Sequence, residues 1–113
     1  MATYLIIGEY SKTAFHGMLT DATQSCDREA AAKALFESIH IKLVNIFYSI
    51  STGSIVCIVE GSAKKFAEIC MITMASGAFQ KIHTEELMSV SAMNDVIHQS
   101  KKKCKEFKES KRS

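Results

Sequence analysis

The chain alternates between runs that suit β-strands and segments that suit amphipathic helices. Four runs are rich in β-branched, aromatic and aliphatic residues, and they predict strands at residues 3–10, 41–51, 54–60 and 79–90. A helix is predicted after the first run, because Ala31, Leu35 and Ile39 recur every four residues. A second helix is predicted after the third run, since Ser62 can cap it and Gly77 can stop it.

These elements follow the order β-α-β-β-α-β, which is the ferredoxin-like pattern of an α+β fold. Right-handed crossovers place the first and third strands at the centre, so the antiparallel sheet has the order 4-1-3-2 and both helices cover one face. The first helix is expected to start at Ser25 or Cys26, after a short helical turn at 14–19. A last helix, from Met93 to about Phe107, is expected after the sheet.

The strand runs are apolar on both faces, whereas a sheet with one face in water alternates apolar and polar residues. Leu5 and Ile6 already put aliphatic side chains on opposite faces, and the second run is expected to place Leu43 and Phe47 opposite Ile46. A second apolar face exceeds the patch that a soluble monomer exposes. We therefore expect a second copy, packed sheet against sheet in a two-fold dimer or a higher oligomer. The alternative cover is the last helix, folded back over that face.

Charge is distributed unevenly along the chain. Residues 101–113 hold seven Lys or Arg and two Glu, so this tail has a net charge of +5. The whole chain has a net charge of +2, which leaves −3 on residues 1–100, the predicted α+β domain. The lysines suggest nucleic acid or an anionic membrane as a partner. The tail has only one aromatic residue and no stacking motif, however, so we interpret it as a solvated helical or frayed terminus.

The cysteines indicate a reducing compartment. Cys26, Cys57, Cys70 and Cys104 show no C-x-x-C spacing and no disulfide framework. No basic leader opens the sequence, and no apolar stretch approaches the roughly 20 residues of a membrane span. We therefore expect a cytoplasmic protein with no membrane partner.

Several segments together resemble the small bacterial GYD-domain family, over about residues 3–91. They are residues 4–10 (YLIIGEY), 30–35 (AAAKAL), 47–48, 55–60 (IVCIVE), and Thr84, Glu85 and Leu87. The resemblance implies a ferredoxin-like fold of the dimeric α/β-barrel kind, in a family without an established biochemical role. The chain departs from the family at the namesake turn, where residues 51–54 read STGS and lack the Tyr and Asp. It also carries His40 where the family usually has a glycine after the first helix.

Two pairs of residues are candidates for acid–base chemistry. Tyr10 and His16 flank the loop after the first strand, where a tyrosine donor and a histidine base could line a ligand pocket between sheet and helices. His83 and Glu85 share one face of the fourth strand, because side chains two residues apart point the same way. The structural alternatives are a packed tyrosine with a solvated histidine, and a polar edge strand. No histidine spacing matches a metal site and no glycine-rich phosphate loop is present, so neither a metal nor a cofactor is expected.

The sequence thus favours a non-catalytic, homo-oligomeric α+β module that binds a small ligand or has a structural role. The alternative is a cofactor-independent oxygenase or isomerase of the dimeric α/β-barrel kind, so whether the chain is an enzyme stays open. The expected partners are a second copy and, where the chain has a binding or catalytic role, a small molecule. Nucleic acid is not an expected partner.

Overall fold

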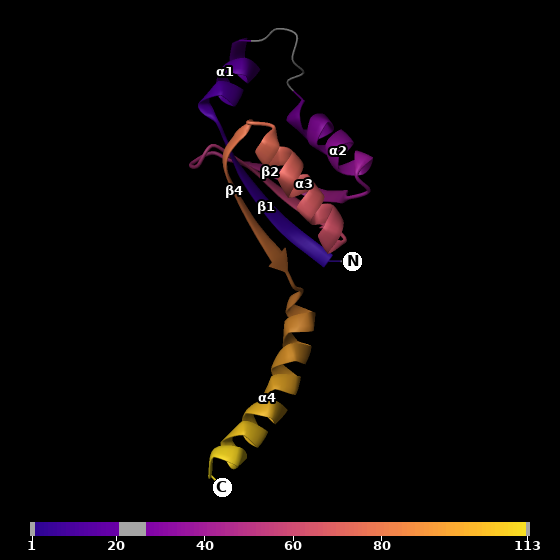
Figure 1. Ribbon diagram of the computed structural model, residues 1–113, viewed down its shortest axis with the longest axis vertical. Helices are drawn as coiled ribbons and strands as arrows, with labels where there is room; N and C mark the ends of the chain where they lie inside the picture. Colours follow the sequence, from indigo (N-terminus) through magenta and orange to yellow (C-terminus); the bar gives the residue numbers. More distant parts are fainter. Residues whose placement is uncertain (1, 21–26, 113) are drawn as a thin grey trace.

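A four-stranded sheet forms the centre of the protein (Figure 1). The computed structural model describes residues 2–20 and 27–112, with the backbone alone from residue 109. The elements in chain order are β1 (Ala2–Tyr10), α1 (Lys12–Thr20), α2 (Arg28–Ser38), β2 (Lys42–Ser49), β3 (Ser54–Gly61), α3 (Ala63–Ala75), β4 (Phe79–Leu87) and α4 (Val90–Arg112). Neighbouring strands are antiparallel in the order β2-β3-β1-β4. The predicted α+β class and the strand order 4-1-3-2 are therefore confirmed.

Helix α1 is longer than the predicted turn at 14–19. It has nine residues, and Ser11 starts it by accepting a hydrogen bond from the Ala14 amide at 3.1 Å from the side-chain oxygen. Gly17 is tolerated inside the helix because its cost of about 1 kcal/mol relative to alanine is small. The next helix, α2, begins at Arg28, and the predicted start at Ser25 or Cys26 lies outside the described residues.

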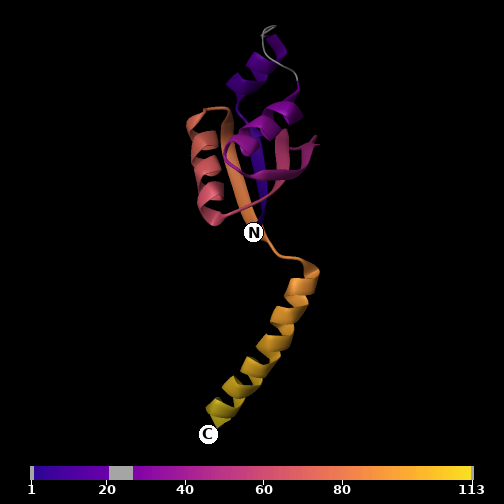
Figure 2. The same cartoon turned by 90° about the vertical axis from the view of Figure 1, so that its right-hand side faces the viewer.

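The two faces of the sheet differ in what covers them. Helices α2 and α3 pack against one face (Figures 1 and 2), and the core lies there. Its buried members are Tyr4, Ile6, Phe36, Ile39, Ile41, Cys57, Val59 and Ile69. No described helix lies over the opposite face of the sheet. On that face, aliphatic side chains of β1 lie directly beside aliphatic side chains of β3. We call this apolar surface the open face, and its members are Leu5, Ile7, Phe47, Val56 and Ile58.

A β-bulge changes the expected faces of β2. The register of β2 against β3 shifts between Leu43 and Asn45, which places one extra residue, Val44, in the strand. As a result, Leu43 and Ile46 both contact the core, although they are three residues apart. Phe47 lies on the open face with 59% of its surface exposed. The prediction that Leu43 shares a face with Phe47 is therefore wrong, because the bulge inverts the alternation.

The end of α2 shows how the chain turns back into the sheet. The Ile41 amide donates to the Phe36 carbonyl at 2.9 Å and the His40 amide donates to the Glu37 carbonyl at 3.0 Å. These two bonds are the Schellman arrangement that closes many helices. It requires a left-handed residue, and His40 has φ of 61°. Phe36 and Ile41 are both buried in the core, so the turn is fixed by packing as well as by hydrogen bonds.

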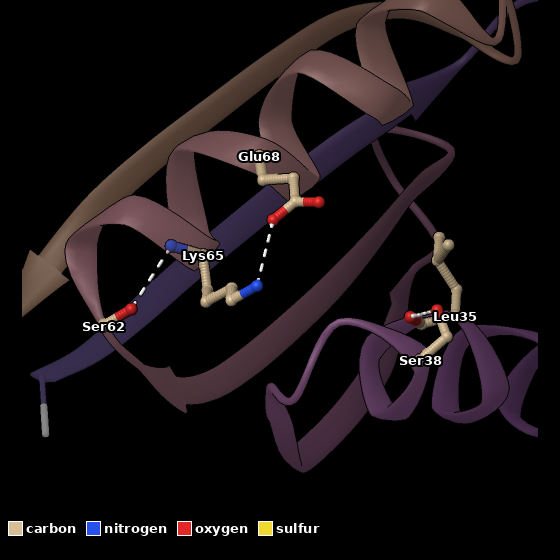
Figure 3. Close-up of polar contacts among 5 residues, drawn as sticks. All are labelled: Leu35, Ser38, Ser62, Lys65 and Glu68. Carbon is tan, nitrogen blue, oxygen red and sulfur yellow. Dashed lines mark hydrogen bonds and ion pairs between the residues drawn. The ribbon is translucent and has the colours of Figure 1, made fainter.

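Helix α3 is closed at its start in the predicted way. The Ser62 side-chain oxygen accepts from the Lys65 amide at 3.3 Å, and Lys65 pairs with Glu68 at 3.5 Å on the outer side of the helix (Figure 3). The same figure shows the Ser38 hydroxyl of α2 donating to the Leu35 carbonyl at 2.6 Å. These exposed contacts contribute little energy each, but they keep both helices regular beside the sheet.

Helix α4 does not fold back over the open face. It leaves the end of β4 and extends away from the rest of the protein (Figures 1 and 2), which gives the molecule dimensions of 71 × 27 × 23 Å. Ser89 caps it, with its side-chain oxygen 3.0 Å from the Ala92 amide. The helix therefore begins earlier than the predicted Met93 and is continuous across residue 100, where the charge pattern changes.

We expect His40→Gly to stabilise the protein by about 1 kcal/mol, because glycine adopts positive φ without the steric cost of a Cβ atom. Urea unfolding monitored by circular dichroism measures this free energy. The matched control is Gly77→Ala, which introduces a Cβ at φ of 73° where no other atom lies within 4 Å. It should destabilise by a similar amount. A loss of stability in His40→Gly would show that the imidazole makes contacts that outweigh the backbone strain.

Candidate functional site

A cavity of about 250 Å³ lies between the helix-covered face of the sheet and helices α2 and α3. All three layers contribute to its wall. The apolar lining residues are Ile6, Gly8, Ile55, Cys57, Phe79 and Ile82 from the strands, Ala31, Ala32, Leu35 and Phe36 from α2, Ile72 from α3, and Ala78. A mainly apolar cavity between sheet and helices is a common form of small-molecule site.

The space exists because small residues face one another. Gly8 in the central strand, Ala31 and Ala32 on α2, and Ala78 before β4 all line the cavity. A Cβ atom on Gly8 would lie only 2.8 Å from the ring of Phe79. The floor of the cavity therefore needs glycine at this position, and larger side chains on α2 would fill the volume.

Four polar side chains also line the cavity, and two of them use their hydroxyl protons within α3. Thr73 donates to the Ile69 carbonyl at 2.9 Å, and Ser76 donates to the Thr73 carbonyl at 2.6 Å. The other two are Tyr10, at the end of β1, and Arg28, at the start of α2. These two supply the phenol and the guanidinium of the site.

Aromatic neighbours hold the ring of Tyr10. Phe79 stacks on it with ring centroids 5.0 Å apart, and Phe15 of α1 meets it edge-on at 5.4 Å. Burial raises the pKa of the Tyr10 hydroxyl, and the positive charge of Arg28 opposes this shift only in part. Tyr10 is therefore a neutral phenol near pH 7 and can donate a hydrogen bond.

Cys57 is the one thiol of the cavity wall, and it is a protonated, buried group. Only 4% of its surface is exposed, and burial raises the pKa of the thiol to about 11. A thiol that keeps its proton is neither a nucleophile nor a metal ligand at neutral pH. Among the described residues that line the cavity there is no carboxylate and no imidazole.

The predicted site residues fall into three places. Tyr10 lines the cavity, whereas His16 is exposed on α1 and is not part of the lining. His83 and Glu85 lie on the side of the sheet opposite the cavity, with His83 Nε2 3.0 Å from Glu85 Oε1. Both side chains of this pair are more than half exposed, at 55% and 54%. The structure thus joins His83 to Glu85 and separates this pair from Tyr10.

Sequence reasoning missed Arg28 and the facing small residues. A single arginine at a helix start carries no distinctive signal. The run of alanines at 30–32 was a signal from which the cavity could have been predicted, because small residues on the side of a helix that faces a sheet leave space above the sheet.

Among the described residues, no group of three or more His, Cys, Asp or Glu side chains could hold a metal ion. Within the same residues, no helix has the length and apolar character needed to cross a membrane. Comparison of the sequence with protein-family models and with curated proteins finds no match.

We expect Cys57 to resist thiol reagents in the folded protein, because at pH 8 a pKa of about 11 leaves only about one molecule in a thousand as thiolate. Cys104 is exposed on α4 and should react fast. Titration with a chromogenic disulfide in a background with Cys26→Ser and Cys70→Ser measures both, and Cys104→Ser should remove the fast phase. A Cys57 thiol that reacts as fast as Cys104 would mean that the cavity is open to bulk water.

Proposed function

We propose that the protein is a non-catalytic, homo-oligomeric module that binds a small, mostly apolar molecule carrying one acidic group. The cavity between the sheet and α2 and α3 is the observation that supports it. A cavity of about 150 Å³ with apolar walls can bind benzene. The volume of about 250 Å³ here suits one aromatic ring with a short side chain.

The acidic group follows from the two polar residues. Arg28 is always protonated and can hold a carboxylate with two parallel hydrogen bonds. Tyr10 lines the same cavity and lies close enough to Arg28 for its positive charge to oppose the rise in the pKa of the Tyr10 hydroxyl. A neutral phenol beside a guanidinium is a donor pair for an anion, and apart from Thr73 and Ser76 the other lining residues are apolar.

Binding is favoured over catalysis by the protonation of the lining groups. A cofactor-independent oxygenase or isomerase would need a base near the substrate to remove a proton. Tyr10 and Cys57 both have raised pKa values, so both retain their protons at neutral pH. His83 and Glu85 have the chemistry of a base, but they lie on the other side of the sheet. Ligand binding is therefore the proposal, and a cofactor-independent oxygenase or isomerase is the alternative.

We expect 3-phenylpropionate to bind about ten-fold more tightly than 3-phenylpropan-1-ol, since a charged hydrogen-bonded pair contributes roughly 1.5 kcal/mol or more. Arg28→Met should remove this preference, and Arg28→Lys should keep part of it. Ala32→Leu should abolish the binding of both probes by filling the cavity, whereas Ala75→Leu, at an exposed position of the neighbouring helix, should not. Calorimetry and ligand-observed NMR measure these affinities.

The outcomes of this experiment are distinct. An alcohol that binds as tightly as the acid would remove Arg28 and Tyr10 from the recognition of the ligand. Probes that bind equally well to Ala32→Leu and to the unchanged protein would show that they occupy another place. Conversion of either probe during the assay would support the enzyme alternative.

We further infer that the protein self-associates through the open face. Its five apolar members lie side by side on three strands, and no described element covers them. A continuous apolar patch of this kind on a soluble protein marks an interaction site. A second copy is the simplest partner, because one two-fold axis covers both open faces at once.

We expect Ile58→Asp to dissociate the assembly, because the interface would bury an unpaired carboxylate. Light scattering coupled to size exclusion, over a range of concentrations, measures the mass. Ile50→Asp is the matched control, since Ile50 is 90% exposed in the turn between β2 and β3 and lies off the open face. A dimer that survives Ile58→Asp, or an unchanged protein that is monomeric at high concentration, would contradict self-association through this face.

Membership in the GYD-domain family is part of this proposal and rests on the sequence resemblance. Location in the bacterial cytoplasm is also part of this proposal. It agrees with cysteines 57, 70 and 104 being free thiols, because a reducing compartment keeps thiols reduced. We expect nucleic acid to be no partner, and neither a cofactor nor a metal is needed for the binding proposed.

A further inference from the structure

Helix α4 carries a second exposed apolar surface. Val90, Met93, Ile97, Cys104 and Phe107 lie along one side of the helix at a 3,4 spacing, in which the polar Ser100 takes the position between Ile97 and Cys104, and Val96 flanks them. We call these six apolar residues the α4 stripe. Between 44% and 68% of the surface of each of them except Cys104 is exposed, and Cys104 is exposed too. This side of α4 is therefore unlike the all-polar surface of a solvated helix.

Pairing of two α4 helices is disfavoured by their charges. When the stripe except Val96 is placed at the a and d positions of a heptad, Lys101 and Lys108 occupy e positions and Lys103 occupies a g position. In a parallel pair, Lys103 of one helix then meets Lys108 of the other, and like charges at such positions repel. A partner for the stripe therefore needs an apolar centre with acidic residues beside it.

The sheet of the same molecule is also a poor partner. Only Met88 and Ser89 separate β4 from α4, and Ser89 already serves as the helix cap through bonds to the Ala92 and Met93 amides. Two residues are the lower limit for a connection between a strand and a helix that packs back on it. The extended position of α4 in both views agrees with this constraint (Figures 1 and 2).

We propose that α4 of each molecule lies across the open face of a second copy, so that two molecules exchange their last helices. The dimensions match, because the stripe from Val90 to Phe107 is about 26 Å long and an eight-residue strand is also about 26 Å long. One two-fold axis then covers all four apolar surfaces, namely both open faces and both stripes.

Charge supports the same arrangement. Glu9, Glu60 and Glu85 lie on the open side of the sheet around its apolar centre, together with Lys42 and Lys81. Each of these two lysines is directly opposite a glutamate on the neighbouring strand, Lys42 opposite Glu60 and Lys81 opposite Glu9. Residues 1–100 carry −3 overall, whereas the lysine-rich end of α4 carries +5. Exchange of helices therefore brings the lysines of α4 to a side of the sheet on which glutamates outnumber lysines by three to two.

This inference rests on the proposed self-association and names the segment that performs it. We expect Ile97→Asp to weaken association at least about 100-fold, because it places a carboxylate in the centre of the buried stripe. Ile97 is exposed within one molecule, so the fold should be unaffected. His98→Asp is the matched control on the opposite side of α4 and should leave the mass unchanged.

A cross-linking experiment identifies the contact directly. In a background with Cys26→Ser and Cys70→Ser, Leu5→Cys adds a thiol to the open face, and the native Cys104 lies in the stripe. We expect mild oxidation to link the new thiol of one chain to Cys104 of another. Lys33→Cys, on the exposed side of α2, is the control and should not link to Cys104. A link within one chain would mean that α4 covers its own sheet, and a Cys104–Cys104 link would mean that two α4 helices pair; either would overturn the proposal.

The remaining outcomes separate this inference from the self-association it rests on. If Ile58→Asp dissociates the dimer and Ile97→Asp does not, the open faces pack sheet against sheet and the exchange of α4 is wrong. If neither variant dissociates it, self-association through the open face fails as well. If Ile97→Asp leaves the mass unchanged but abolishes co-sedimentation with phosphatidylglycerol vesicles, α4 is a membrane-surface helix and the exchange is again wrong.

Discussion

Pairing of β1 with β3 puts aliphatic side chains on both faces of the sheet centre, while α2 and α3 cover only one of those faces. Two features of the molecule follow directly from this imbalance. The covered face provides the core and the cavity, and the open face leaves apolar surface in need of a partner. Burial of such surface stabilises by roughly 25 cal/mol per Å², so its exposure in one molecule favours assembly.

The cavity and the open face are two results of one strand pattern. On the covered side, Gly8 gives the Phe79 ring space to pack against the strand, and the small alanines of α2 line the cavity beside it. Tyr10 and Arg28 line the same wall as Thr73 and Ser76, whose hydroxyls donate to carbonyl groups of α3. A ligand held there would contact β1 from one side while a second copy contacts β1 from the other. The central strand is thus shared by both proposed activities.

Much of the fold could be predicted from the sequence because it depends on local periodicity. The apolar runs and the right-handed crossovers between them predicted the strand order correctly, and Ser62 and Gly77 predicted the limits of α3. Three features depended on details that periodicity does not carry. The bulge at Val44 inverted the faces of β2, Ser89 moved the start of α4, and the cavity arose from a residue pair, Gly8 and Ala32, that is distant in sequence. Tyr10 was predicted as a pocket residue from its position after a strand, whereas Arg28 had no such signal.

The separation of α4 from the sheet has a consequence for local stability. The helix extends away from the rest of the molecule (Figures 1 and 2), so few buried contacts oppose its unfolding. Segments of this kind open at a smaller free-energy cost than core strands, and their backbone amides exchange hydrogen with the solvent faster. In a single molecule, the amides of α4 would therefore exchange faster than those of the central strand β1.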